Sequence, residues 1–215
     1  MQAIVCESYG SPDVLTIKDV PTPAPKDNEV LVCVHATSVN YGYLGQKMGA
    51  YAEYVAVPEN DCFVEKPAAL PHDEAAALPY GAVMAWHLLK KAGVRKGQKV
   101  LVNGASGGIG SAAVRGRLPF SEAKALLNDD GTVLSVSFKT RHLLQMLRSS
   151  FGGKHKMLCV LAPGKVDDLR AVRELIENGA LRAHVARRFA FTDAPAAHRL
   201  VEEGKHTGAV VITFA

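Results

Sequence analysis

Residues 1–65 contain short runs rich in Val, Ile and Thr, separated by clusters of turn-forming residues. The runs cover residues 2–7, 14–20, 29–39, 51–57 and the shorter 62–65. Gly-Ser-Pro-Asp and Pro-Thr-Pro-Ala-Pro-Lys-Asp-Asn stand between the first three. Short β-prone runs bounded by turn residues are typical of strands. We therefore predict that the first sixty-odd residues form a small, largely antiparallel β unit.

From residue 71 the apolar positions recur at helical spacing. Residues 73–78 and 81–92 predict two helices, the second ended by Gly93. Farther along, the pattern predicts strands at 132–138, 157–161, 182–189 and 209–214, and helices at 121–128, 140–150, 166–178 and 194–203. The order is β-rich, then α/β, then mixed, so the predicted fold class is α/β.

Residues 98–114, QKVLVNGASGGIGSAAV, predict a short buried strand, a glycine turn and the start of a helix. In this arrangement backbone N–H groups and a helix N-terminus converge on a phosphate, and glycine allows the close approach. Against the pattern G-x-G-x-x-G the first glycine is Ala105. The residues predicted to hold a pyrophosphate are Ser106, Gly107, Gly108, Ile109 and Gly110. The alternative is a tight strand-to-helix turn that binds no ligand.

The same turn permits two other interpretations. Residues 104–108 also satisfy G-x-S-x-G, the nucleophile elbow of α/β-hydrolases, with Ser106 as nucleophile. Acids and histidines follow in the required order, namely Asp168, Asp193, His198 and His206. A hydrolase elbow does not need the additional glycines. The turn also looks like that of short-chain dehydrogenases, but Tyr43 and Lys47, which have the catalytic spacing, lie upstream of it.

Composition narrows the class of protein. With 215 residues, 48% hydrophobic and 21% charged, the chain is long enough for one large or two small globular domains. The opening MQAIVCESYG has no basic region followed by a long apolar run, so we predict no signal peptide. No stretch of the sequence approaches the ~18 consecutive apolar residues of a spanning helix, so we predict no membrane span. The four cysteines are isolated, which indicates buried free thiols in a reducing compartment, the cytoplasm by default.

Charge and histidine spacing argue against two kinds of ligand. The net charge of +4 is mild, and no aromatic residues interleave with the basic clusters, so we expect no nucleic-acid partner. No histidine lies at metal-ligand spacing from a cysteine or a second histidine, so we predict no zinc site and assign catalysis to none of them. The eight are His35, His72, His87, His142, His155, His184, His198 and His206.

Several segments, in order, resemble the medium-chain dehydrogenase/reductase superfamily in its zinc-independent, quinone-oxidoreductase-like branch. They are the opening MQAIVCESYGSPDVLTIKDVPTPAPKDNEVLVCVHATSVN, GAYAEYVAVPEN, DEAAALPYGAVMAWHLLKKAGVRKGQKVLVNGASGGIG and the tail AHRLVEEGKHTGAVVITF. The resemblance implies a shortened GroES-like β-barrel catalytic domain, from residues 1–80 and 163–215. It implies a shortened Rossmann-like nucleotide-binding domain at 81–162.

Two blocks of the family pattern are absent here, one near residues 41–44 and one near 115–117. In a doubly wound sheet of order 3-2-1-4-5-6, the second gap removes strands 2, 3 and 4. Strands 99–103 and 132–138 would then face each other about 10 Å apart, with backbone groups unpaired. We therefore expect either that they pair directly or that another chain covers the edge, which makes a homo-oligomer the predicted state.

The resemblance implies an NAD(P)H-dependent reductase of small quinones or α,β-unsaturated carbonyls that works without metal. Asn40 would then approach the nicotinamide ribose or the substrate, and Phe138 would line the nicotinamide pocket. The alternatives are a strand-end turn residue for Asn40 and a core residue for Phe138. No general acid is evident, so the catalytic residues are unassigned.

NADPH is the predicted cofactor, with NADH possible. Asp129 and Asp130 have nearly the spacing of the acid that marks NAD binding, but they fall in a predicted turn after a helix. Gly208-Ala209 stands where relatives often place Gly-Lys, so a cationic contact is lost. The competing hypothesis is a deletion variant or pseudoenzyme that binds no cofactor and acts as a structural or oligomeric protein.

Overall fold

The structure is a computed structural model that describes residues 1–8, 10–40, 50–94, 132–135, 140–150, 156–159 and 165–214. At the N-terminus, β1 (Gln2–Cys6) pairs antiparallel with β2 (Leu15–Asp19), which follows the 3-10 turn η1 (Pro12–Val14). β3 (Glu29–Cys33) pairs antiparallel with β5 (Tyr54–Pro58). These pairings confirm the antiparallel character predicted for this part of the chain.

Two strand predictions in this region are wrong. The run 29–39 is not one strand, because β4 (Ala36–Val39) leaves the sheet of β3 and pairs antiparallel with β9 (Ala209–Thr213). Residues 62–65 form no strand. There the Asp61 carboxylate accepts the N–H of Cys62 at 2.7 Å, and the Asp61 carbonyl accepts the N–H of Phe63 at 2.9 Å. Local turn bonds thus occupy the donors that a ladder would need.

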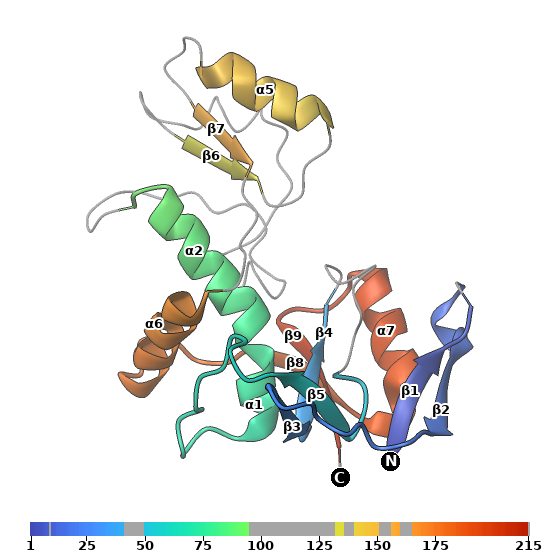
Figure 1. The fold of residues 1–215 in the computed structure, drawn as a ribbon. Coiled ribbons are helices and arrows are strands. Elements are labelled where there is room, and N and C mark those ends of the chain that lie inside the picture. The colour runs from blue at the N-terminus through green and yellow to red at the C-terminus, as the bar shows by residue number, and fades with distance from the viewer. Residues whose placement is uncertain are drawn as a thin grey trace.

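The strands β4, β9 and β8 (Val185–Ala190) form a sheet that joins both ends of the chain. β8 runs parallel to β9 and is connected to it through η4 (Phe191–Asp193) and α7 (Ala194–Glu203). The apolar face of α7 packs on this sheet (Figure 1). The core between them consists of Val39, Phe191, Ala194, Ala197, Val201, Val210 and Ile212.

A second core lies among three helical segments. The helix α1 (His72–Ala77) is followed by a π-helical turn (Pro79–Val83) and then by α2 (Met84–Lys91), which packs beside α6 (Val166–Glu177). Leu78, Ala82 and Val83 are buried against Val172. The predicted helix ends are confirmed, since Gly93 and Gly179 adopt positive φ angles of 65° and 69°.

The third part contains β6 (Thr132–Ser135), α5 (Thr140–Ser150) and β7 (Lys156–Cys159). The two strands are parallel, as predicted for the last strands of the nucleotide-binding sheet. α5 packs on β7, where Ser149 Oγ accepts the N–H of Met157 at 3.0 Å. Figure 1 shows these elements together above α2, away from the β-rich part. The predicted strand 99–103 lies outside the described residues, so its pairing with 132–138 stays a prediction.

Candidate functional site

Of the predicted cofactor-binding residues, the structure describes Asn40 alone. Ser106, Gly107, Gly108, Ile109, Gly110 and Phe138 lie outside the described residues, as do Tyr43 and Lys47. Their predicted roles therefore stay predictions.

Asn40 directly follows β4 and is half-buried. Its strand is held in the β4–β9–β8 sheet, where Val39 pairs with Val210. The Asn40 amide nitrogen donates to Ser38 Oγ at 2.8 Å and lies 3.5 Å from the Ser38 carbonyl oxygen. This bond orients the amide, and among the described residues its carbonyl oxygen has no hydrogen-bond partner. Asn40 is thus placed to accept a hydroxyl hydrogen of a ligand, although the same bond would also serve a strand-end turn.

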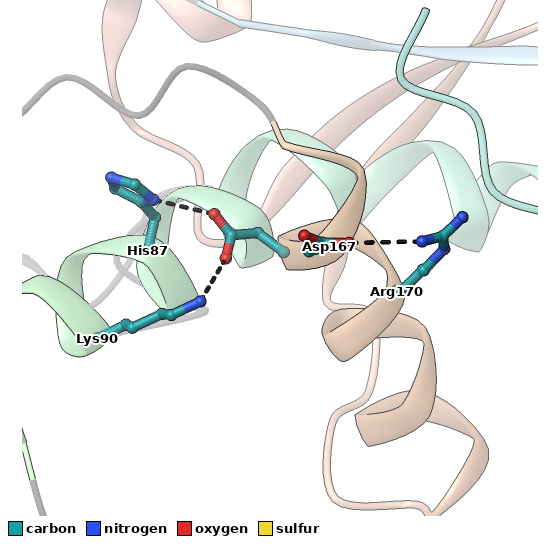
Figure 2. A network of polar contacts seen from close by, with 5 residues as sticks. His87, Lys90, Asp167 and Arg170 are labelled. Atoms are coloured by element: carbon teal, nitrogen blue, oxygen red, sulfur yellow. Dashed lines mark hydrogen bonds and ion pairs between the residues drawn. The ribbon is translucent and has the colours of Figure 1, made fainter. Parts of the chain in front are cut away.

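A buried polar network joins α2 to α6 (Figure 2). His87 Nδ1 and Asp168 Oδ2 are 2.9 Å apart, and Lys90 Nζ lies 3.5 Å from Asp168 Oδ1. His87 and Lys90 are three positions apart and so share a face of α2. The Asp168 side chain is 3% exposed and that of His87 is 10% exposed. A carboxylate is therefore buried between two helices with a partner on each oxygen.

The electrostatics of the network keep Asp168 ionised. The hydrogen bond from His87 lowers the pKa of the Asp168 carboxyl, with a further contribution from the Lys90 charge. Burial acts in the opposite direction and raises this pKa, but the net shift is downward. A bonded, charged carboxylate is a strong constraint on the relative position of α2 and α6.

The network holds α2, the helix that precedes the predicted cofactor-binding turn in the sequence. α2 ends shortly before the segment 98–114 that carries the glycine turn. Sequence reasoning misses the network, because it treats His87 as a lone structural histidine and Asp168 as a candidate acid of a hydrolase. The pair is 81 residues apart, so sequence spacing carries no signal for it. The i, i+3 pair of His87 and Lys90 on α2 is the one local indication.

The hydrolase candidates are not brought together as a triad would require. Asp168 is bonded to His87, not to His198 or His206. The His198 ring packs edge-on against Tyr51, with centroids 5.5 Å apart, and His206 Nδ1 lies 3.3 Å from the carbonyl oxygen of Leu200. The described residues therefore give the hydrolase interpretation no additional support.

Two other features of the described residues bear on ligands. A hollow of about 430 Å³ lies between residues 63–65 and the face of α6 that carries Arg170, Arg173 and Glu177. Its charges are partly paired, since Arg173 and Glu177 form an ion pair at 2.9 Å, and it is not an apolar pocket for a quinone. Within the described part of the chain, no group of three or more His, Cys, Asp or Glu side chains could hold a metal.

Comparisons with known proteins agree with the architecture. A sequence model of the family described as zinc-binding dehydrogenase matches residues 111–212. The mouse protein named NAD(P)H oxidoreductase RTN4IP1, mitochondrial, is 40% identical over 74 residues, which are 32% of this chain and 18% of that protein. The mouse quinone oxidoreductase is 27% identical over 218 residues, covering 75% of this chain and 65% of that protein.

The fold comparison leads to the same group of proteins. The quinone oxidoreductase from Thermus thermophilus, whose structure was also determined in complex with NADPH, superposes with a TM-score of 0.74. It is 23% identical, and the superposition covers 99% of this chain and 100% of that one. The chain is similar in sequence and in fold to proteins of the medium-chain dehydrogenase/reductase superfamily. The relatives named quinone oxidoreductase agree with the quinone-oxidoreductase-like resemblance found in the sequence.

The mixed α/β fold with small sheets agrees with this similarity. The chain spans less than two thirds of the length of the curated relatives it matches, at 18% and 65%. This agrees with a shortened GroES-like unit beside a reduced Rossmann-like sheet. No helix of the described residues is both long and apolar enough to cross a membrane.

Proposed function

We propose that this chain is an NAD(P)H-dependent oxidoreductase that transfers a hydride to a quinone or an α,β-unsaturated carbonyl without zinc. The observation that carries the proposal is the glycine pattern at 104–110, in a chain similar to proteins of the medium-chain dehydrogenase/reductase superfamily. A relative named as an NAD(P)H oxidoreductase and another whose structure includes NADPH support the cofactor class. NADPH is our choice, with NADH as the alternative.

The chain's own groups have separable roles in this proposal. Backbone N–H groups of residues 106–110 would donate to the pyrophosphate, and Phe138 would exclude water beside the nicotinamide. The Asn40 amide, oriented by its bond to Ser38, would accept a ribose or substrate hydroxyl. The cofactor supplies the hydride when bound. The proton donor is unassigned.

The competing proposal is a chain that has lost cofactor binding with its missing segments and persists as a structural or oligomeric protein. NADPH fluorescence distinguishes the two. Saturable quenching or a blue shift, with turnover of a menadione-like quinone, is expected for the reductase. Absence of any change at high micromolar cofactor would end that proposal.

Matched variants make the test specific to the glycine turn. Gly107→Asp places a side chain and a negative charge where the pyrophosphate would lie, and it should weaken NADPH binding at least about tenfold, that is by about 1.4 kcal/mol or more. Asp129→Ala/Asp130→Ala should leave the preference between NADPH and NADH unchanged, because we place these acids in a turn. Ester hydrolysis that Ser106→Ala abolishes would instead favour the hydrolase.

The cytoplasm and a small-molecule substrate, with no nucleic-acid or membrane partner, remain part of the proposal. The cytoplasmic assignment rests on the isolated thiols, and the mouse RTN4IP1 relative is named as mitochondrial. The prediction that these thiols are buried is wrong for Cys6 and Cys33, which are exposed.

A further inference from the structure

Two histidines that are distant in sequence meet on the surface of the protein. His35 lies between β3 and β4, and His72 is the first residue of α1. Their rings have centroids 4.3 Å apart and planes inclined by 23°. Both residues are exposed. The pair is separate from Asn40, which follows the other end of β4.

The backbones that carry the two rings are fixed by the fold. The His35 carbonyl accepts the N–H of Phe214 at 3.0 Å, which ties it to the residue after β9. Next to His72, the Asp73 carboxylate binds the Arg188 guanidinium of β8. The two imidazoles are therefore presented together by a sheet and a helix, rather than meeting by chance motion of a terminus.

The two rings can share one ion only after they turn. In the structure they are stacked, with centroids 4.3 Å apart, so their nitrogens do not point at a common position. A zinc–nitrogen bond of about 2.0–2.1 Å lies in the plane of the imidazole, so each ring must rotate to reach the ion. Because both side chains are exposed, rotation about their χ angles can turn a nitrogen of each ring toward a common point.

The lysine near the pair is bound to backbone carbonyls. The Lys66 ammonium is held by the carbonyl oxygens of Leu70, at 2.7 Å, and Pro67, at 3.4 Å. Among the described residues, no nitrogen of either ring makes a hydrogen bond.

We propose that His35 and His72 form a surface site for a late first-row divalent cation such as Zn²⁺, with water completing the coordination. Imidazole nitrogen suits zinc, nickel and copper far better than magnesium or calcium. The site would link the β3–β4 connection to α1 and is independent of the proposed redox function. It differs from zinc sites that are recognised by the spacing of their ligands in the sequence. Here there are two protein ligands, and the fold brings them together.

The test uses thermal unfolding of the full chain with ZnCl₂ or NiCl₂, and with MgCl₂ as the hard-cation control. A cation that binds the folded state alone raises the unfolding temperature with increasing concentration. We expect this rise with zinc and nickel and not with magnesium. His35→Phe and His72→Phe keep the aromatic contact but remove the ligands, so each should weaken zinc binding at least about tenfold by losing the chelate.

Two matched variants separate the pair from other ligands. His184→Gln removes an exposed histidine outside the pair, and Cys33→Ser removes the exposed thiol two residues before His35. Both should bind zinc like the unaltered chain. Nitrogen NMR of the histidine rings supplies a second readout, with zinc expected to shift the resonances of His35 and His72 together at equal occupancy.

Three outcomes would overturn the proposal. The first is that His35→Phe and His72→Phe bind zinc as tightly as the unaltered chain. The second is that Cys33→Ser loses zinc binding. The third is that zinc shifts the ring resonances of other histidines only. Circular dichroism of each variant confirms that loss of binding is not loss of folding.

Discussion

Both a close contact and a positive backbone φ angle require glycine at position 208. Its φ is +95°, and a Cβ built there would lie 2.4 Å from both the carbonyl oxygen and the Cδ2 atom of His184. The next residue, Ala209, donates its N–H to the same carbonyl at 2.8 Å, so the approach begins the β8–β9 pairing. Gly204, with φ +64° at the end of α7, has no atom near its built Cβ.

These two glycines form a matched pair for mutation. Gly208→Ala combines an unfavourable φ with a backbone clash, and we expect it to lower the free energy of unfolding by about 2–4 kcal/mol. Gly204→Ala meets the unfavourable φ alone and should cost about 1 kcal/mol. Chemical denaturation measures both. Equal losses would show that the contact with His184 is absent in solution.

His198 is a half-buried titratable group beside the β4–β9–β8 core. Burial lowers the pKa of its ring, with Glu202 opposing. Its Nε2 atom is buried and has no hydrogen-bond partner within the described part of the chain. The folded state thus resists protonation of this ring.

The sign of the pH effect follows from that lowered pKa. Above about pH 6.5, the unfolded-state pKa of histidine, the ring is neutral in both states and costs nothing. As the pH falls below that value, the unfolded state takes up a proton and the folded state does not, so stability declines. His198→Phe keeps the edge contact with Tyr51 and should reduce this decline between about pH 6.5 and 5, measured by urea unfolding. The exposed-site variant His184→Gln should keep the full decline; a His198→Phe profile identical to it would contradict the prediction.

At the scale of elements, α2 and α6 are held by both apolar and polar contacts. Leu78 and Val83 pack against Val172, and the His87–Asp168 pair closes the same interface. The π-helical turn between α1 and α2 begins at Pro79, which lacks the N–H of a regular helix. Consequently the position of α2 depends on α6, far along the chain.

Substitutions of the adjacent residues Asp167 and Asp168 test this interface. Asp168→Asn removes a charge that His87 and Lys90 both contact, and we expect a loss of about 2–4 kcal/mol. Asp167→Asn alters a side chain that is 84% exposed and pairs with Arg170, and it should change stability by less than about 0.5 kcal/mol.

The pH dependence adds a second readout. Because the Asp168 pKa is lowered in the folded state, its contribution is present above about pH 3.9 and is lost as the pH falls through the lower folded value. Asp168→Asn should lack this acid-dependent loss. Urea unfolding of both variants from about pH 7 to 3 measures this loss of unfolding free energy. If Asp168→Asn and Asp167→Asn lose the same stability over this range, the network is contradicted.

At the scale of the whole molecule, the sheets are small. The described residues form three two-stranded sheets and one three-stranded sheet. Parallel strands are normally buried on both faces, and β6 and β7 form a parallel sheet of two strands. On α5 the side chains of Leu143, Leu144 and Leu147 are exposed, by 37%, 58% and 52%. These features support our proposal that the chain self-associates.

Light scattering coupled to gel filtration tests that proposal. We expect a mass of at least twice the 22.9 kDa of one chain. If assembly depends on the sheet edge, this mass should not change when NADPH is added. A monodisperse species of 22.9 kDa across the accessible concentration range would contradict self-association. It would leave direct pairing of 99–103 with 132–138 as the remaining way to satisfy the predicted sheet.

The sequence by itself determined the elements with strong local signals. The helices 140–150 and 194–203 have the bounds that the sequence predicts, and Gly93 and Gly179 end helices because their left-handed conformation favours glycine. The resemblance to the medium-chain dehydrogenase/reductase superfamily was likewise visible in ordered segments of sequence. Local propensity and turn chemistry act over a few residues, so they are visible without coordinates.

Tertiary structure alone decided which distant residues meet. It divided 29–39 into two strands of different sheets, because β4 has its partner at the far end of the chain. It joined His87 to Asp168 and placed His35 against His72, contacts that no spacing predicts. Such pairs depend on how whole elements pack, and packing is a property of the folded chain rather than of any window of its sequence.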